Sequence, residues 1–145
     1  MMKIPLYKQE FSWSCLATCV KMVLEYYGII KQERDLRILL KTTPSYGTIW
    51  DYAGREIKRI GFELVWKKFW NLDNLVSVVE QSIPVIIGVK REGEIHGHAM
   101  VVVDISERYV EVADPQNGEL VTLQKEDFLE LWTGRDNIAG YIKKI

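Results

Sequence analysis

Hydrophobic positions recur at helical spacing near the start of the chain. Between Cys15 and Tyr27 they fall three and four positions apart, which predicts a helix with a wide apolar stripe. Ser14 is a suitable N-cap for this helix, and Gly28 is placed to end it as a C′ glycine. We therefore expect a central, mostly buried helix over residues 15–27.

The remaining elements alternate with turn-rich breaks such as "TTPSYG". A more exposed helix is predicted around "KQERDLRILLK", and another over residues 49–60, capped by Thr48 and ended by Gly61. "LDNLVSVVEQS" predicts a helix with Asn71 as its cap, and "KEDFLELW" predicts a short one. Strands are predicted in the apolar, β-branched or aromatic segments "FELVWKKFW", "PVIIGVK", "GHAMVVVDI", "YVEVAD" and "AGYIKKI".

The order of these elements indicates the fold class. Helices come first and an antiparallel sheet second, which is typical of the α+β class. At 145 residues the chain is long enough to bury one hydrophobic core. Because no repeat, low-complexity segment or linker divides it, we predict a single domain over residues 1–145.

Charge and hydropathy narrow the range of partners. The formal net charge is −1, with Lys and Arg scattered along the chain, which argues against nucleic acid or an anionic membrane surface. No segment approaches the roughly 20 apolar residues that a membrane-spanning helix needs. The N-terminus "MMKIPLYKQE" has neither an apolar core region nor a cleavage site of a signal peptide, so we expect a cytoplasmic protein.

The two cysteines, Cys15 and Cys19, lie four positions apart on the first predicted helix. Side chains at this spacing are about 5–6 Å apart at Cβ, whereas a disulfide needs roughly 3.5–4.5 Å. We therefore expect two free thiols. Cys19 lies one turn deeper in the helix and is expected to be a core residue.

Cys15 has the position of a candidate nucleophile. A reactive cysteine must be a thiolate, and both a helix N-terminus and a neighbouring histidinium favour that form. Cys15 falls in the first turn of its helix. The chain has only two histidines, His96 and His98, so the choice of a base is narrow.

His98 and Asp114 can share one face of a hairpin. His98 begins one predicted strand and Asp114 closes the next. If the loop between them has three residues, Ile105 pairs with Tyr109 and Met100 falls opposite Asp114. The carboxylate could then accept the ring proton of His98, as the third member of a catalytic triad does. A two-residue loop would put the two side chains on opposite faces, and the sequence leaves both registers open.

Gln9 is a candidate for the oxyanion hole. Acyl transfer forms an oxyanion, which a side-chain amide and a backbone N–H can stabilise together. Gln9 precedes a polar and aromatic loop that leads into the helix of Cys15, so its amide and the Cys15 N–H could converge.

Four ordered motifs resemble the bacteriocin-processing (double-glycine leader) cysteine peptidases, a branch of the papain-like superfamily. The family pattern is a glutamine, five residues, and then a cysteine that opens a helix. A Gly-His pair before an apolar strand matches Gly97-His98, and an aspartate block matches Asp114-Pro115 with Gly118 behind it. The remaining matches are Cys15, Cys19, Met22, Leu24, Tyr26, Tyr27 and Gly28, and a closing motif with Phe128, Trp132 and Gly134.

The resemblance covers nearly the whole chain and implies a papain-like α+β fold, with the helix of the nucleophile packed on an antiparallel sheet. It implies Cys15 as nucleophile, His98 as base, Asp114 as the residue that orients His98, and Gln9 at the oxyanion hole. It also implies a peptide or protein substrate, with small residues before the cleaved bond, and no metal or organic cofactor. Since the chain carries neither transporter membrane segments nor a nucleotide-binding loop, we expect a free-standing peptidase.

One position departs from the family pattern. The family usually has glycine after the cysteine, whereas this chain has Leu16. A leucine there could pack into the core, narrow the cleft or mark a copy that no longer cleaves. An inactive peptide-binding module on the same fold therefore stays an alternative to the peptidase.

A zinc site is the main alternative from another class. Cys15 and Cys19 at i, i+4 and His96 and His98 at i, i+2 supply four side chains of the types that bind zinc. The spacing is not a common zinc-finger pattern, and His96 is more readily explained as a loop residue near the cleft. The other candidates for a cofactor site, which we interpret as core and rim aromatics, are Trp50, Trp66, Trp70 and Trp132.

Overall fold

The computed structural model describes residues 1–94 and 96–145. Five α-helices, one 3₁₀ helix and six strands are assigned within these residues. The helices are α1 (Cys15–Tyr26), α2 (Glu33–Leu39), α3 (Trp50–Glu56), η1 (Ile57–Ile60), α4 (Leu72–Glu80) and α5 (Lys125–Thr133). The strands are β1 (Phe62–Lys67), β2 (Val85–Val89), β3 (His98–Ile105), β4 (Tyr109–Asp114), β5 (Glu119–Gln124) and β6 (Ala139–Lys144).

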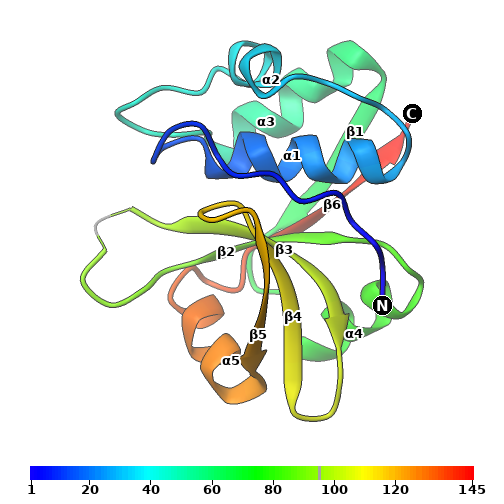
Figure 1. The fold of residues 1–145 in the computed structure, drawn as a ribbon, viewed down its shortest axis with the longest axis vertical. Coiled ribbons are helices and arrows are strands. Elements are labelled where there is room, and N and C mark those ends of the chain that lie inside the picture. Colours follow the sequence, from blue (N-terminus) through cyan, green and yellow to red (C-terminus); the bar gives the residue numbers. More distant parts are fainter. Residues whose placement is uncertain (95) are drawn as a thin grey trace.

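The six strands form one antiparallel sheet in the order β1-β6-β2-β3-β4-β5. In Figure 1, helices α1, α2 and α3 lie above this sheet, whereas α4 and α5 lie below and beside it. Helix α1 packs on β3, the strand that begins with His98, and α3 packs on β1. The predicted α+β fold, with N-terminal helices on an antiparallel sheet, is confirmed.

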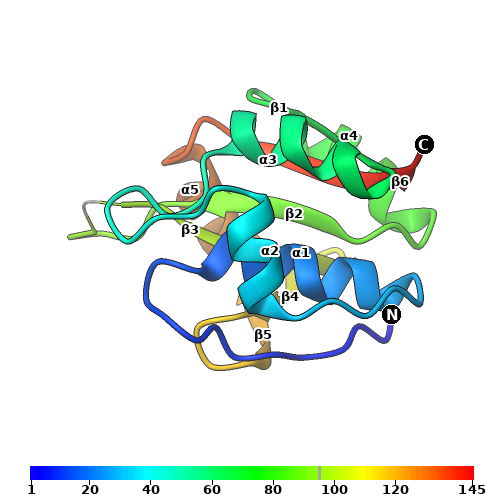
Figure 2. The ribbon, with the colours of Figure 1, turned by 90° about the horizontal axis from the view of Figure 1, so that it is seen from above.

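The core is apolar and lies between α1 and the central strands. All of β2 is buried, and the first six residues of β3 are buried as well. Helix α1 buries nine consecutive residues from Leu16 to Leu24. This helix has no polar face of the usual kind because α2, the sheet and the N-terminal segment surround it (Figure 2). No helix that the structure describes is long and apolar enough to cross a lipid bilayer.

The sequence predicted most helices correctly but not all of their caps. Asn71 caps α4 through a capping box with Asn74, as expected. Ser14 precedes α1 but makes no capping bond, because its hydroxyl donates to the Phe11 carbonyl instead. The predicted helix over residues 49–60 is an α-helix followed by the 3₁₀ helix η1, and its cap is Ile49 rather than Thr48.

Two strand predictions need correction. The segment "FELVWKKFW" is a strand only as far as Lys67. Strand β5 was not predicted, although "ELVTLQ" alternates between more and less exposed residues in the way an edge strand does. Gly118 (φ +68°) immediately precedes β5, so the turn "DPQNG" and the alternation after it were the available signals.

A β-bulge in β3 determines which side chains face α1. At the loop end, Ile105 pairs with Val110 rather than with the predicted Tyr109. The register then shifts between Val102 and Asp104, and beyond this shift Val101 pairs with Ala113. This is the register that the three-residue loop predicted for the other end of the hairpin. The extra residue in β3 therefore brings His98 and Asp114 to the same face of the sheet.

Candidate active site

His98 and Asp114 form a direct pair at the end of the β3–β4 hairpin. His98 Nε2 lies 2.6 Å from Asp114 Oδ1, and both side chains are largely buried. With Nε2 occupied by the carboxylate, Nδ1 is the ring nitrogen left for Cys15. The diagonal placement predicted from the sequence therefore produces the expected contact.

The surroundings of His98 favour its charged form. Burial by itself lowers the pKa of a histidine, but the hydrogen bond with Asp114 and the interaction with the Cys15 side chain act more strongly in the other direction. Together they raise the pKa of His98 from 6.5 to about 9. His98 is therefore an imidazolium at neutral pH.

Asp114 is held in its charged form. Burial alone would raise its pKa, but the hydrogen bonds from His98 and from the Gln116 backbone N–H lower it below the usual value. The positive charge of Arg91 acts in the same direction. Asp114 and His98 thus form an ion pair across the neutral pH range.

Cys15 lies near His98 and Asp114 but belongs to the helical layer, on the other side of the site from the sheet. It is the first residue of α1, where backbone N–H groups have no partner inside the helix and the helix dipole favours negative charge. Its half-buried side chain lines a cavity of about 300 Å³ together with His98. A free thiol, an imidazolium and a carboxylate are thereby brought together.

This cavity, here called the cleft, runs between the loops on the helical side and the ends of β2 and β3. The segment Pro44–Thr48 forms one wall, and Trp50 lies beside it. The sequence pattern indicated only a break between helices at "TTPSYG". Trp13 and Arg135 also line the cleft, although neither was among the predicted site residues. Only the position of Trp13, two residues before Cys15, could have indicated its role.

Leu16 packs into the core and also borders the cleft. Only 3% of its surface is exposed, although it is among the residues that line the cleft. Of the three possibilities for this departure from the family pattern, packing into the core therefore agrees with the structure. Its burial leaves the Cys15 side chain partly accessible.

Gln9 lies beside the pair of His98 and Asp114. Its backbone N–H donates to the Pro115 carbonyl at 2.7 Å, which ties it to the turn after Asp114. Its side-chain Nε2 donates to the Phe11 carbonyl, and its Oε1 is buried without a partner among the described residues. Gln9 borders a second cavity that also contacts His98, but it does not line the cleft with Cys15.

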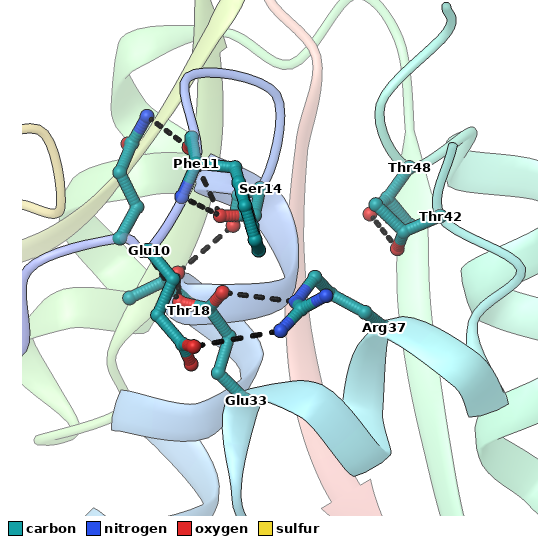
Figure 3. A network of polar contacts seen from close by, with 9 residues as sticks. Glu10, Phe11, Ser14, Thr18, Glu33, Arg37, Thr42 and Thr48 are labelled. Atoms are coloured by element: carbon teal, nitrogen blue, oxygen red, sulfur yellow. Dashed lines mark hydrogen bonds and ion pairs between the residues drawn. The ribbon is translucent and has the colours of Figure 1, made fainter. Parts of the chain in front are cut away.

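A polar network holds the loop between Gln9 and Cys15 (Figure 3). Its centre is Glu33 of α2, a carboxylate with only 4% of its surface exposed. Glu33 accepts hydrogen bonds from the Glu10 backbone N–H and from Arg37 Nε, and it lies 2.6 Å from the Thr18 hydroxyl. The guanidinium of Arg37 also stacks over the Phe11 ring. Helix α2 therefore positions the loop that leads into the nucleophile's helix.

The structure does not support the alternative zinc site. Cys19 is fully buried, and burial raises its pKa well above the usual value for a thiol. His96 is exposed, and the Nε2 of His98 is already paired with Asp114. Within residues 1–94 and 96–145, no group of three or more His, Cys, Asp or Glu side chains could hold a metal ion.

Comparison with known proteins identifies the family of this chain. The model of the Peptidase C39 family matches residues 3–136. The chain belongs to the peptidase C39 family. No curated protein matches it.

Solved structures of C39 peptidases share the fold along the whole chain. The peptidase domain of Streptococcus ComA, a bi-functional ABC transporter involved in quorum sensing, is 23% identical, with a TM-score of 0.82 and complete coverage of both chains. A protein from Bacillus anthracis described as a C39-like peptidase is 19% identical, with a TM-score of 0.83 and coverage of 99% and 96%. A double glycine motif protease from an AMS/PCAT transporter, solved with its leader peptide, is 21% identical, with a TM-score of 0.76 and coverage of 99% and 94%. These structures show the shared fold, and the family model supports a cysteine peptidase or a related module.

The pKa of His98 makes the stability of this C39 domain depend on pH. Because folding raises this pKa from 6.5 to about 9, the stabilisation is complete below about pH 6.5 and is lost as pH rises through 9. One pKa unit corresponds to about 1.4 kcal/mol, so the free energy of unfolding should fall by up to about 3 kcal/mol. Urea unfolding between pH 6 and 10 should show this decline in the wild type and a flatter profile in His98→Gln. The variant His96→Gln, which changes an exposed histidine nearby, should keep the wild-type slope, and equal slopes in all three proteins would contradict the pairing.

Removal of the Glu33 charge should destabilise the loop that precedes Cys15. In Glu33→Gln the partly buried Arg37 loses the nearer of its two carboxylate partners, and one hydrogen-bond acceptor becomes a donor. We therefore expect the free energy of unfolding, measured with urea, to fall by about 1–3 kcal/mol. The control is Glu10→Gln, because the exposed Glu10 carboxylate contacts the same arginine at 3.5 Å. We expect Glu10→Gln to lower the free energy of unfolding by less than about 1 kcal/mol. If both variants lowered the free energy of unfolding equally, Glu33 would not be the centre of this network.

Proposed function

We propose that this chain is a cysteine peptidase in which Cys15, His98 and Asp114 form the catalytic triad. The observation that carries the proposal is the ion pair of His98 and Asp114, with its free ring nitrogen available to a thiol at a helix N-terminus. Cys15 Sγ attacks the carbonyl carbon of a peptide bond. The C–N bond then breaks, and the imidazolium of His98 gives its proton to the leaving amine.

Asp114 orients His98 and stabilises its charge during both steps. Water then attacks the thioester on Cys15, and His98 accepts the proton of that water as the thiolate leaves. An amine in place of water would turn the same reaction into a transfer of the acyl group.

Gln9 supplies the side chain of the oxyanion hole, together with the Cys15 backbone N–H. Its present hydrogen bond to the Phe11 carbonyl is replaceable, because the Ser14 N–H and hydroxyl donate to the same oxygen at 3.1 and 3.0 Å. A carbonyl oxygen has two lone pairs, so Phe11 stays paired when the amide turns away. The amide is then free to donate to the oxyanion of a bound substrate.

The substrate is a peptide or a segment of a protein. The leader peptide bound to the double glycine motif protease supports this class. Small residues before the cleaved bond are what the family resemblance implies. The two free thiols support a reducing compartment such as the cytoplasm.

The reactivity of Cys15 tests the proposed triad before any substrate is known. Iodoacetamide should alkylate Cys15 of the wild type rapidly near pH 7, because the imidazolium of His98 stabilises the thiolate. The rate should fall at least tenfold in His98→Ala and stay unchanged in His96→Ala. Mass spectrometry reads both cysteines at once, and the buried Cys19 serves as an unreactive internal control.

A Cys15 that reacts equally in the wild type and in His98→Ala would favour the inactive peptide-binding module instead. Once a substrate is found, Cys15→Ala should lower its turnover by roughly 10⁴-fold or more and leave the fold intact. Activity that survives in this variant would refute Cys15 as the nucleophile.

Gln9→Ala should lower kcat by roughly 10²- to 10³-fold with little change in KM, because the lost amide acts on the oxyanion and not on the ground state. Its backbone bond to Pro115 is retained, so unfolding experiments should show a stable domain. The matched control is Gln124→Ala, an exposed glutamine at the end of β5. A Gln9→Ala enzyme as active as this control would show that another group stabilises the oxyanion.

A further inference from the structure

Arg135 is an exposed residue whose side chain borders the cleft of Cys15 and His98. It follows α5 in a tight turn, in which its N–H donates to the Trp132 carbonyl at 3.0 Å and its own carbonyl accepts from the Ile138 N–H at 3.1 Å. Its side chain lines the cleft together with Cys15 and His98. The backbone of this turn thus directs an arginine toward the site.

Gly97 makes room for the Arg135 side chain. A Cβ atom at Gly97 would lie 2.5 Å from Arg135 Nε, 2.8 Å from its Cδ and 3.0 Å from its Cζ. The guanidinium therefore lies against bare backbone next to His98, and any larger residue at position 97 would displace it.

The charge of Arg135 has no partner among the described residues. None of the ion pairs and side-chain hydrogen bonds found there involves its guanidinium. The neighbouring Asp136 is paired with Lys68 instead. Of the described residues that line the cleft, none is Asp or Glu, whereas His96, His98 and Arg135 are basic.

We propose that Arg135 binds a carboxylate of the peptide substrate. A guanidinium with its donors unpaired, in a cleft wall without acidic side chains, matches a carboxylate in both charge and geometry. The inference rests on the proposed peptidase function and adds a preference to it. The carboxylate belongs either to an Asp or Glu side chain or to the C-terminus of the peptide.

The position of that carboxylate is limited by the size of the cleft. Arg135 and Cys15 line the same cavity of about 300 Å³. An extended peptide advances about 3.3 Å per residue, so roughly two or three residues separate the carboxylate from the bond that is cleaved. A peptide that presents the acidic group farther away cannot reach both Arg135 and Cys15 at once.

Matched peptides test the proposal. One set contains a central Gly-Gly, with Glu or Gln at each of the three positions on either side and an amidated C-terminus. A second set ends as a free acid or an amide within three residues of Gly-Gly. We expect the wild type to prefer the carboxylate member of at least one pair about tenfold in kcat/KM, which corresponds to about 1.4 kcal/mol. Arg135→Gln should abolish that preference, so that both members of the pair are cleaved with the same kcat/KM.

Two further variants sharpen the test. Arg135→Lys should retain part of the preference, because it keeps the charge but loses the paired donors. The control Arg108→Gln changes an exposed arginine in the β3–β4 loop, at the opposite end of the hairpin, and should behave as the wild type. The peptide pair whose carboxylate preference is lost in Arg135→Gln shows whether the bound carboxylate belongs to an acidic side chain or to the C-terminus.

A binding measurement separates this proposal from the peptidase function. Fluorescein-labelled versions of the same peptides are titrated against Cys15→Ala, with and without Arg135→Gln, and followed by fluorescence anisotropy. A carboxylate preference that disappears with Arg135 supports the inference even if the wild type cleaves nothing. Equal binding and turnover of both members of every pair would overturn it while leaving the peptidase intact. A chain that neither binds nor cleaves any of these peptides would contradict both proposals.

Discussion

The hydrogen bond between His98 and Asp114 is the contact on which the candidate site depends. It fixes which ring nitrogen is free, and together with the interaction with Cys15 it outweighs the burial that would otherwise neutralise the histidine. The rest of the fold serves to keep these two side chains on one face and to bring a thiol toward them. Two adjacent strands hold the pair, and a buried helix in the opposite layer supplies Cys15 at its first residue.

The helical side of the site is held by polar contacts, in contrast to the apolar core behind it. Glu33 joins α2 to the loop before Cys15, and the turn after Asp114 holds the backbone of Gln9. The turn between β4 and β5 runs beside the N-terminal segment (Figure 2). In this turn, a Cβ at Gly118 would be 2.8 Å from the Lys8 nitrogen. The residues around the nucleophile are therefore positioned from both layers, and the loop between Gln9 and Cys15 connects them.

Much of this arrangement could be predicted from the sequence, because it depends on local signals. The spacing of apolar residues predicted α1, and two histidines left few choices for a base. The remaining features depend on contacts between distant segments. The bulge that sets the register of His98 and Asp114 has no local marker in "HAMVVVDI", and the hydroxyl of Ser14 is taken by Phe11 rather than by the helix. Arg135 lies beside His98 because Gly97, the residue before β3, has no side chain.

The bulge in β3 also restricts how relatives of this chain can change in length. An insertion or deletion on the loop side of Val103 lengthens or shortens a solvent-exposed connection and leaves the paired residues beyond the bulge unmoved. Between Val103 and His98, however, one added or lost residue would turn His98 to the other face of the sheet. Length variation among active descendants of the same hairpin should therefore collect at residues 106–108, while the segment from His98 to Val103 keeps its length even where its side chains differ.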